Sequence, residues 1–165
     1  MYSRKSFERY KSMVINTRIF GEVTIGDDKM INFPKGIVGF PELTDFALIH
    51  DSEAGDQGGI RWMQSVQEPN FAIPVIDPLV VSDTYSPQVD DDLLTTIGGI
   101  DDVLVLVTIT VPSDITKMSV NLKAPLIINV SEKKACQLIL EQDYPVKYYV
   151  YDILKAKKEA EKDGE

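Results

Sequence analysis

Two residues offer the side chains on which nucleophilic catalysis depends: the single histidine, His50, and the single cysteine, Cys136. A Ser-His-Asp or Cys-His mechanism would depend on His50, which lies in a strand-like apolar run, FALIHD, and is better interpreted as a barrel-edge residue. Cys136 lies between a polar and an apolar stretch, without a nearby histidine or a glycine-rich nucleophile turn, so we expect a buried or half-buried small residue. One cysteine also excludes an intramolecular disulfide and a multi-cysteine zinc site.

Carboxylates are numerous, but their spacing fits turns and helix ends better than catalysis or metal binding. Glu68 and Asp77 flank a predicted strand at residues 71–76 and could form a general acid and base. Each lies beside a proline, which favours a turn residue. The acidic run at residues 90–92 lacks the alternating spacing and final glutamate of a calcium loop. It precedes an apolar pair and then two glycines, which is typical of a short helix with an acidic start and a glycine stop.

The glycines at positions 36 and 39 do not form a phosphate-binding loop, because the lysine and the preceding strand of such a loop are missing. We expect them to let the chain turn sharply beside Pro34 and Pro41. The sequence therefore gives no support for an enzyme, and it predicts neither a cofactor nor a metal ion.

Short apolar runs separated by turn residues predict the fold. The Gly-Asp-Asp-Lys sequence at residues 26–29 predicts a hairpin between residues 21–25 and 30–33. The run at residues 103–111, VLVLVTITV, is nearly continuous and β-branched, which is typical of a central strand covered on both faces. The other predicted strands are residues 14–20, 46–50, 60–66, 71–76, 118–122, 126–130 and 137–141. So many short strands predict a mainly β, single-domain fold that resembles a closed antiparallel β-barrel.

Helical signals occur in two places. One short helix is expected after residues 90–92, and the tail from Tyr151 to Lys162 has strong helix formers but little apolar surface. The residues before Met13 are polar and basic, without a strand or helix period. We therefore predict a flexible basic extension at residues 1–12, a barrel domain at residues 13–151 and a polar helical tail at residues 152–165.

The net charge of −9 is spread unevenly along the chain. Residues 1–13 carry +3 and residues 152–165 carry −1, which leaves −11 for residues 14–151. A body this acidic repels phosphate backbones, so direct nucleic-acid binding is disfavoured and a basic protein partner is favoured. No apolar run reaches the roughly 20 residues of a membrane span, and the N-terminus lacks the apolar centre of a secretion signal. We expect a cytoplasmic protein without membrane contact.

Three stretches carry a resemblance to a known family. They are FPKGIVGFPELTDFAL from Phe33, WMQSVQEPNFAIPVIDP from Trp62 and NLKAPLIINVSEKKACQLIL from Asn121. In this order they resemble motifs of the flagellar assembly factor family FliW. Together they cover most of residues 13–151, and the ordered set is more specific than any single motif.

This resemblance implies a compact β-barrel-like domain with no catalytic activity and no cofactor. It also implies two protein partners: the RNA-binding translational repressor CsrA, which the family binds and antagonises, and flagellin, which it binds alternatively. The chain would thereby couple flagellin synthesis to export. Separately from the resemblance, we expect the free protein to be a monomer.

Loops that carry the motifs are expected to form the partner surface, because a motif residue in a turn has less packing reason to be specified. The candidate partner-binding residues are Ile37, Phe40, Gln64, Glu68, Pro69, Asp77, Asn121 and Asn129. The two asparagines could equally cap turns.

Two alternatives compete with this interpretation. An export chaperone without a regulatory role would bind flagellin but not CsrA. A small acidic hydrolase or ligand-binding barrel would use Glu68 and Asp77 around a pocket.

Overall fold

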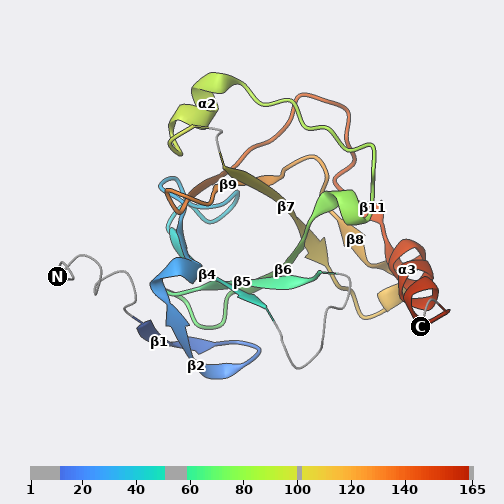
Figure 1. Ribbon diagram of the computed structural model, residues 1–165, viewed down its shortest axis with the longest axis horizontal. Coiled ribbons are helices and arrows are strands. Elements are labelled where there is room, and N and C mark those ends of the chain that lie inside the picture. Colours follow the sequence, from blue (N-terminus) through green and yellow to red (C-terminus); the bar gives the residue numbers. More distant parts are fainter. Residues whose placement is uncertain (1–11, 51–58, 100–101, 164–165) are drawn as a thin grey trace.

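The computed structural model describes residues 12–50, 59–99 and 102–163, which form a ring of strands with a hairpin and helices around it (Figure 1). The strands are β1 (Ser12–Thr17), β2 (Gly21–Gly26), β3 (Met30–Asn32), β4 (Asp45–His50), β5 (Arg61–Ser65), β6 (Ala72–Ile76), β7 (Val103–Thr110), β8 (Ser119–Val120), β9 (Leu126–Asn129), β10 (Lys134–Gln137) and β11 (Tyr148–Tyr149). The helical elements are α2 (Asp91–Thr95), α3 (Tyr151–Asp163) and the 3₁₀ turns η1 (Asp27–Lys29), η2 (Pro78–Val80) and η3 (Ile115–Lys117).

Seven of these strands close into a barrel, which confirms the predicted fold class. The order is β7-β6-β5-β4-β3-β10-β9, and β9 pairs with β7 again to complete the ring. Every pairing in the ring is antiparallel except one short parallel contact, where Lys134 of β10 lies beside Asn32 of β3. Closure leaves the ring itself without a free edge, and a free edge would be open to pairing with other chains.

The barrel interior is filled by alternating residues from all seven strands, as the two-residue period of a strand requires. Phe33 and Phe46 are fully buried there, and Met63, Leu106 and Leu126 are almost so. Burial of each such side chain contributes about 1.5–3 kcal/mol. This interior cluster is the main core, and it forms the floor of the site described below.

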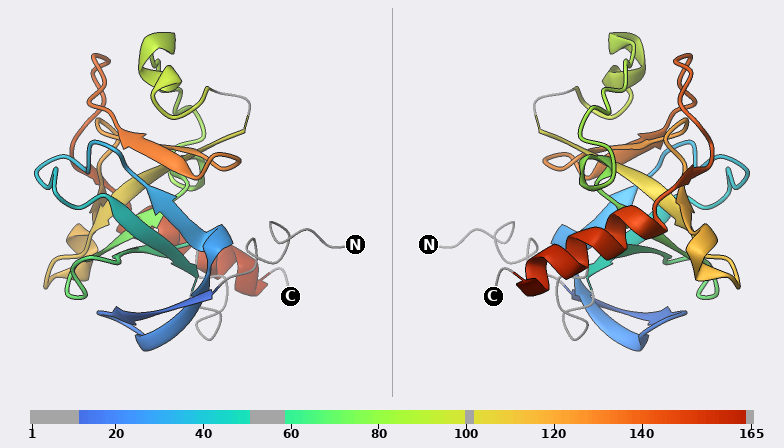
Figure 2. Two further views of the ribbon diagram at one scale, coloured as in Figure 1. Left: turned by 90° about the vertical axis from the view of Figure 1, so that its left-hand side faces the viewer. Right: turned by 90° about the vertical axis from the view of Figure 1, so that its right-hand side faces the viewer.

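Strand β7 is covered on both faces, as its nearly continuous apolar sequence predicts. Leu106 points into the barrel cluster, whereas Val107 and Ile109 belong to a second cluster outside the barrel. That outer cluster is covered by Tyr85 and by Ile153 and Leu154 of α3. Figure 2 shows α3 lying across this side of the barrel. The C-terminal helix is therefore confirmed, and its first turn packs against the barrel.

The predicted hairpin at residues 21–33 is wrong. Strand β2 pairs instead with β1, Thr17 opposite Gly21, and β3 pairs with β4. The three residues 18–20 form the hairpin loop, and Gly21 takes the positive φ of +65° that such loops need after them. In the Gly-Asp-Asp-Lys sequence, Gly26 ends β2 and the other three residues form η1, which leads from the hairpin into the barrel. The hairpin packs on the outer face of β4 and β5 through Ile15.

The last predicted barrel strand, residues 137–141, is also misplaced. Strand β10 ends at Gln137. The next residue, Leu138, lies opposite Pro125, and its N–H donates to Pro125 O at 3.1 Å. Proline has no N–H to donate in return, so the ladder of paired hydrogen bonds stops here. Strand β11 has only two residues and has no sequence signal of its own. Residues 138–142 are left as an irregular segment, in which Ile139 and Glu141 are exposed but Leu140 is buried in the outer cluster.

Candidate functional site

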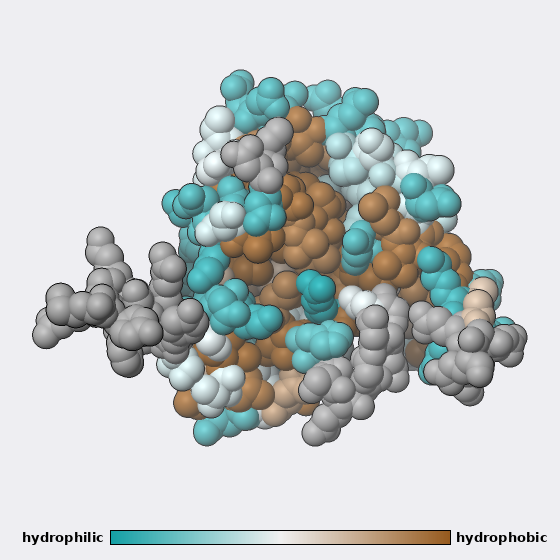
Figure 3. Space-filling view, in the orientation of Figure 1, coloured by the Kyte–Doolittle hydropathy of each residue, from teal (hydrophilic) through white to brown (hydrophobic). Residues whose placement is uncertain are grey.

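A groove of about 330 Å³ opens at one end of the barrel and is mainly apolar. Its rim carries four exposed apolar side chains: Val38 (51% exposed), Phe40 (41%), Ile139 (65%) and Val146 (60%). Its floor includes Met63, Val75 and Leu126 of the barrel core. We call it the mouth groove. The mouth groove opens on the side of the barrel that faces away from the viewer in Figure 3. The face shown there also has hydrophobic residues in its middle, with hydrophilic residues around them.

The loop between β3 and β4 places Ile37 and Phe40 in the mouth groove. Their backbones form an isolated antiparallel β-bridge, in which Phe40 N donates to Ile37 O at 2.8 Å and Ile37 N donates to Phe40 O at 3.3 Å. Gly36 makes this turn possible: its φ is +68°, and a Cβ there would lie 2.6 Å from Phe40 O. Only glycine fits both conditions without strain.

A row of aromatic rings ties the rim to the core. The rings pack edge to face. Their centroids are 5.3 Å apart for Phe33 and Phe46, 6.2 Å for Phe46 and Phe71, and 4.8 Å for Phe71 and Phe40. Such edge-to-face pairs contribute about 0.5–1.5 kcal/mol each beyond burial. Phe40 is therefore held in a fixed position although it is partly exposed, which reduces the entropy lost when a partner covers it.

Two side chains fix the opposite wall of the mouth groove. Gln137 accepts a hydrogen bond from Val38 N at 2.8 Å and donates one to Ala124 O at 3.1 Å, so it joins the two walls. Asn121 Oδ1 accepts from Lys123 N and Ala124 N at 3.0 and 3.1 Å. The predicted capping role of Asn121 and its place beside the groove are thus compatible.

Gln64 lies inside the molecule, only 1% exposed, and braces the loop between β5 and β6. Its Nε2 donates to Ser65 O, Pro69 O and Phe71 O at 2.9, 3.0 and 3.2 Å, and its Oε1 accepts from Arg18 N at 3.0 Å. Both of its polar atoms are buried and hydrogen-bonded within the chain, so we do not include it in a partner surface.

Glu68 and Asp77 are exposed, but they lie at opposite ends of β6. Five residues of strand separate these ends, which corresponds to about 16 Å. Glu68 accepts from Asn70 N at 3.3 Å, and Asp77 caps η2 by accepting from Leu79 N at 2.9 Å. Both are turn residues, and the pairing that a hydrolase would require is absent between them.

Asn129 is 4% exposed and holds a turn. Its Oδ1 accepts from Glu132 N at 3.0 Å, and its Nδ2 donates to Gly99 O at 3.4 Å. Of the eight predicted residues, the structure thus brings Ile37, Phe40 and Asn121 together and leaves Glu68, Pro69 and Asp77 exposed elsewhere. Sequence reasoning missed Val38, Ile139 and Val146, because an exposed apolar residue has the same appearance in a sequence as a core residue.

The potentially reactive side chains lie where they serve the fold. Cys136 is half-buried beneath α2, and burial raises the pKa of its thiol, which keeps it protonated and unreactive near neutral pH. Across residues 12–50, 59–99 and 102–163, no group of three or more His, Cys, Asp or Glu side chains is placed to hold a metal ion. No helix in the described part of the chain is long and apolar enough to cross a membrane.

The fold and the groove together define a class: a small seven-stranded β-barrel protein with an apolar groove at its mouth. The family model described as FliW protein matches residues 13–150. The flagellar assembly factor FliW of Lachnoclostridium phytofermentans is 44% identical over 158 residues, covering 93% of this chain and 99% of the relative. That of Lachnospira eligens is 43% identical over 147 residues, covering 87% of this chain and 97% of the relative. The chain therefore belongs to the FliW family of flagellar assembly factors.

A solved structure supports the same conclusion. The crystal structure of the flagellar assembly factor FliW has a TM-score of 0.75 to this chain at 30% sequence identity. The match covers 84% of this chain and 97% of that chain. The shared fold extends over nearly the whole of the known structure.

Proposed function

We propose that this FliW-family chain is a non-catalytic, protein-binding regulator of flagellum assembly in the cytoplasm. It binds the translational repressor CsrA and antagonises it, and alternatively it binds flagellin, so that flagellin synthesis follows flagellin export. The relatives are named for flagellar assembly, and the particular partners are the proposal.

The mouth groove is the observation that carries this proposal. Its exposed rim and buried floor form one continuous apolar surface, which a folded chain does not need for its own stability. An amphipathic helix that lays its apolar face into such a groove is a common mode of peptide recognition. We assign the mouth groove to flagellin, whose terminal segments carry amphipathic helices and are unstructured before assembly.

Purified protein mixed separately with CsrA and with flagellin, both from the same organism, tests the proposal by size-exclusion chromatography. We expect co-elution with each partner, and relief of CsrA binding to RNA in a mobility-shift assay without any RNA shift by this protein alone. Binding to neither partner would overturn the proposal. Binding to flagellin but not to CsrA would replace it with an export chaperone.

The groove itself is tested by adding charge to its rim. Val38→Asp combined with Val146→Asp should weaken flagellin binding at least tenfold, since a desolvated carboxylate would face apolar surface. Val111→Asp combined with Val130→Asp is the matched control, because these valines are 53% and 47% exposed and line no part of the groove. Equal loss in both variants would contradict the assignment.

A further inference from the structure

The negative charge of the protein comes from one stretch of the chain. No Lys, Arg or His occurs between Trp62 and Thr116, and this stretch contains nine carboxylates. Outside it, cationic side chains and carboxylates are equal in number, 17 of each. The electrostatic field that would attract a basic partner therefore originates mainly from β6, β7 and the segment between them.

Part of this stretch forms an arm over the barrel, at residues 82–97 including α2, which lies at the top of Figure 1. The arm is linked to the segment 138–142 by a side chain. Gln142 Oε1 accepts from Gln88 N at 2.6 Å, and its Nε2 donates to Ser86 O at 3.0 Å. Ser86 N donates to Tyr144 Oη at 3.0 Å. This clip holds the arm and the segment at a fixed separation.

A second groove, of about 230 Å³, lies between the arm and the segment 138–142. We call it the arm groove. Its apolar lining includes Leu93 (42% exposed) and Ile139 (65% exposed), and its charged lining consists of the exposed carboxylates Asp90 and Glu141. The residues that line it include no Lys or Arg. The Lys123 ammonium donates a hydrogen bond to Gln142 O at 2.9 Å. Lys123 itself lines the mouth groove and is not among the residues that line the arm groove.

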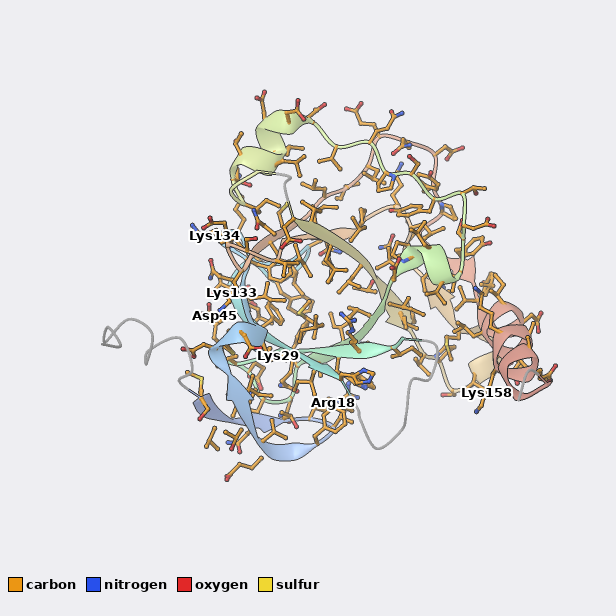
Figure 4. All side chains as sticks on the ribbon, in the orientation of Figure 1. Arg18, Lys29, Asp45, Lys133, Lys134 and Lys158 are labelled. Atoms are coloured by element: carbon orange, nitrogen blue, oxygen red, sulfur yellow. The ribbon has the colours of Figure 1, made fainter. Side chains whose placement is uncertain are left out.

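Figure 4 labels some of the described cations and shows where they lie relative to this arm. Lys29, Lys133 and Lys134 are on the β3 and β10 side of the barrel, and Lys158 is on α3. The arm thus presents an apolar surface with negative charge along it, and Lys123 is the cation that approaches the groove, through its hydrogen bond to Gln142 O.

We infer that the arm groove docks a basic, amphipathic segment of the RNA-binding repressor, an inference that rests on the proposed function. A protein that binds RNA must present Lys and Arg side chains to phosphates, and these cations are complementary to the carboxylates of the arm. The apolar lining adds burial that a purely charged surface would lack. RNA and anionic membrane surfaces are repelled by the same charges.

The inference also explains how one small barrel serves two partners alternatively. Ile139 lines both the mouth groove and the arm groove. A partner that fills either groove covers this side chain, so the occupants compete for it directly. No movement of the barrel is required for the exchange.

Charge reversal in the arm groove tests the inference. Asp90→Lys combined with Glu141→Lys should raise the Kd for CsrA at least tenfold, measured by calorimetry, and leave the Kd for flagellin within about twofold. Glu22→Lys combined with Glu159→Lys is the matched control, since both residues are exposed, lie outside both grooves and give the same change in net charge. The control should lose no more than about threefold, through weaker long-range steering alone.

The outcomes separate the inference from the proposed function. If the unaltered chain captures CsrA and the two variants lose equal affinity, only the net charge matters and the inference is overturned. If the unaltered chain fails to capture CsrA, the proposed function fails and the inference with it. Should the lysine pair unfold the arm, Asp90→Asn with Glu141→Gln repeats the test with side chains of the same size, against Glu22→Gln with Glu159→Gln.

Discussion

The mouth groove and the arm groove share Ile139 but are built by different physical means. The mouth groove is an extension of the core: its rim residue Phe40 connects through Phe71 and Phe46 to the barrel interior. The arm groove lies at the surface, where the polar clip from Gln142 adds to the apolar packing of the arm and holds it near the segment 138–142. A groove continuous with the core should resist change and accept an apolar ligand. A groove held partly by exposed hydrogen bonds should open more easily and depend on charge.

The first prediction tests whether the mouth groove depends on the turn at Gly36. Gly36→Ala places a Cβ 2.6 Å from Phe40 O at a φ of +68°, so we expect a loss of about 3 kcal/mol in the free energy of unfolding. Gly39→Ala is the control, because Gly39 also has a positive φ, +88°, but no atom lies within 4 Å of its Cβ position. The control should lose only about 1 kcal/mol. Urea unfolding of both variants measures the difference, and equal losses would show that the close approach at Gly36 is unimportant.

The second prediction concerns Tyr85, where the arm is rooted in the core. Its hydroxyl donates to Leu122 O at 2.8 Å in a buried position. Tyr85→Phe leaves that carbonyl without a partner and should cost about 2 kcal/mol in thermal or urea unfolding. Tyr144→Phe, which removes the hydroxyl that accepts from the exposed Ser86 N, should cost less. A larger loss at Tyr144 would contradict this order.

The same residue predicts a pH dependence. Burial, together with the neighbouring Tyr144, raises the pKa of Tyr85 well above its usual value near 10. Because the folded state holds the proton more tightly than the unfolded state, this contribution to stability is complete below about pH 10 and declines as the pH rises further. The decline should be smaller in Tyr85→Phe. An identical alkaline profile in both proteins would mean that Tyr85 titrates normally.

The third prediction tests the clip of the arm groove. Gln142→Ala removes two hydrogen bonds at exposed positions, so the free energy of unfolding should fall by only about 1 kcal/mol. The arm should open locally, which hydrogen exchange at Gln88 N measures, and CsrA binding should weaken more than flagellin binding. Gln137→Ala is the counterpart in the mouth groove and should have the opposite preference. The same preference in both variants would show that the grooves are not separate sites.

The two grooves also differ in how far the sequence predicts them. The barrel follows from β-branched runs such as that of β7, which specify strands by their own composition. Register does not follow as easily: Gly-Asp-Asp-Lys looks like a hairpin turn, but Gly21 decides the true hairpin because it supplies the required φ. The motif with Ile37 and Phe40 indicates the mouth groove because its glycines mark a special turn.

The arm groove gives a weaker signal in the sequence. Its walls are brought together by Gln142, whose partners lie 54 and 56 positions away, and no local pattern reports such a contact. Similarly, Gln64 and Asn129 are polar motif residues that the sequence assigns to the partner surface, but the structure buries both as braces. A polar side chain in a motif can be specified by the backbone groups it satisfies as easily as by a partner.

The smallest effect on stability is expected at the residue that both grooves share. Ile139 is 65% exposed, so Ile139→Ser should change the free energy of unfolding by less than about 0.5 kcal/mol. It should nevertheless weaken both CsrA and flagellin binding, each by about tenfold, because each partner covers this side chain. Ile115→Ser is the control, since Ile115 is 51% exposed on η3 and lines neither groove. Calorimetry with each partner measures both affinities. If only one affinity falls, Ile139 belongs to one site, and the alternation between partners must then come from overlap elsewhere or from a change in the barrel itself.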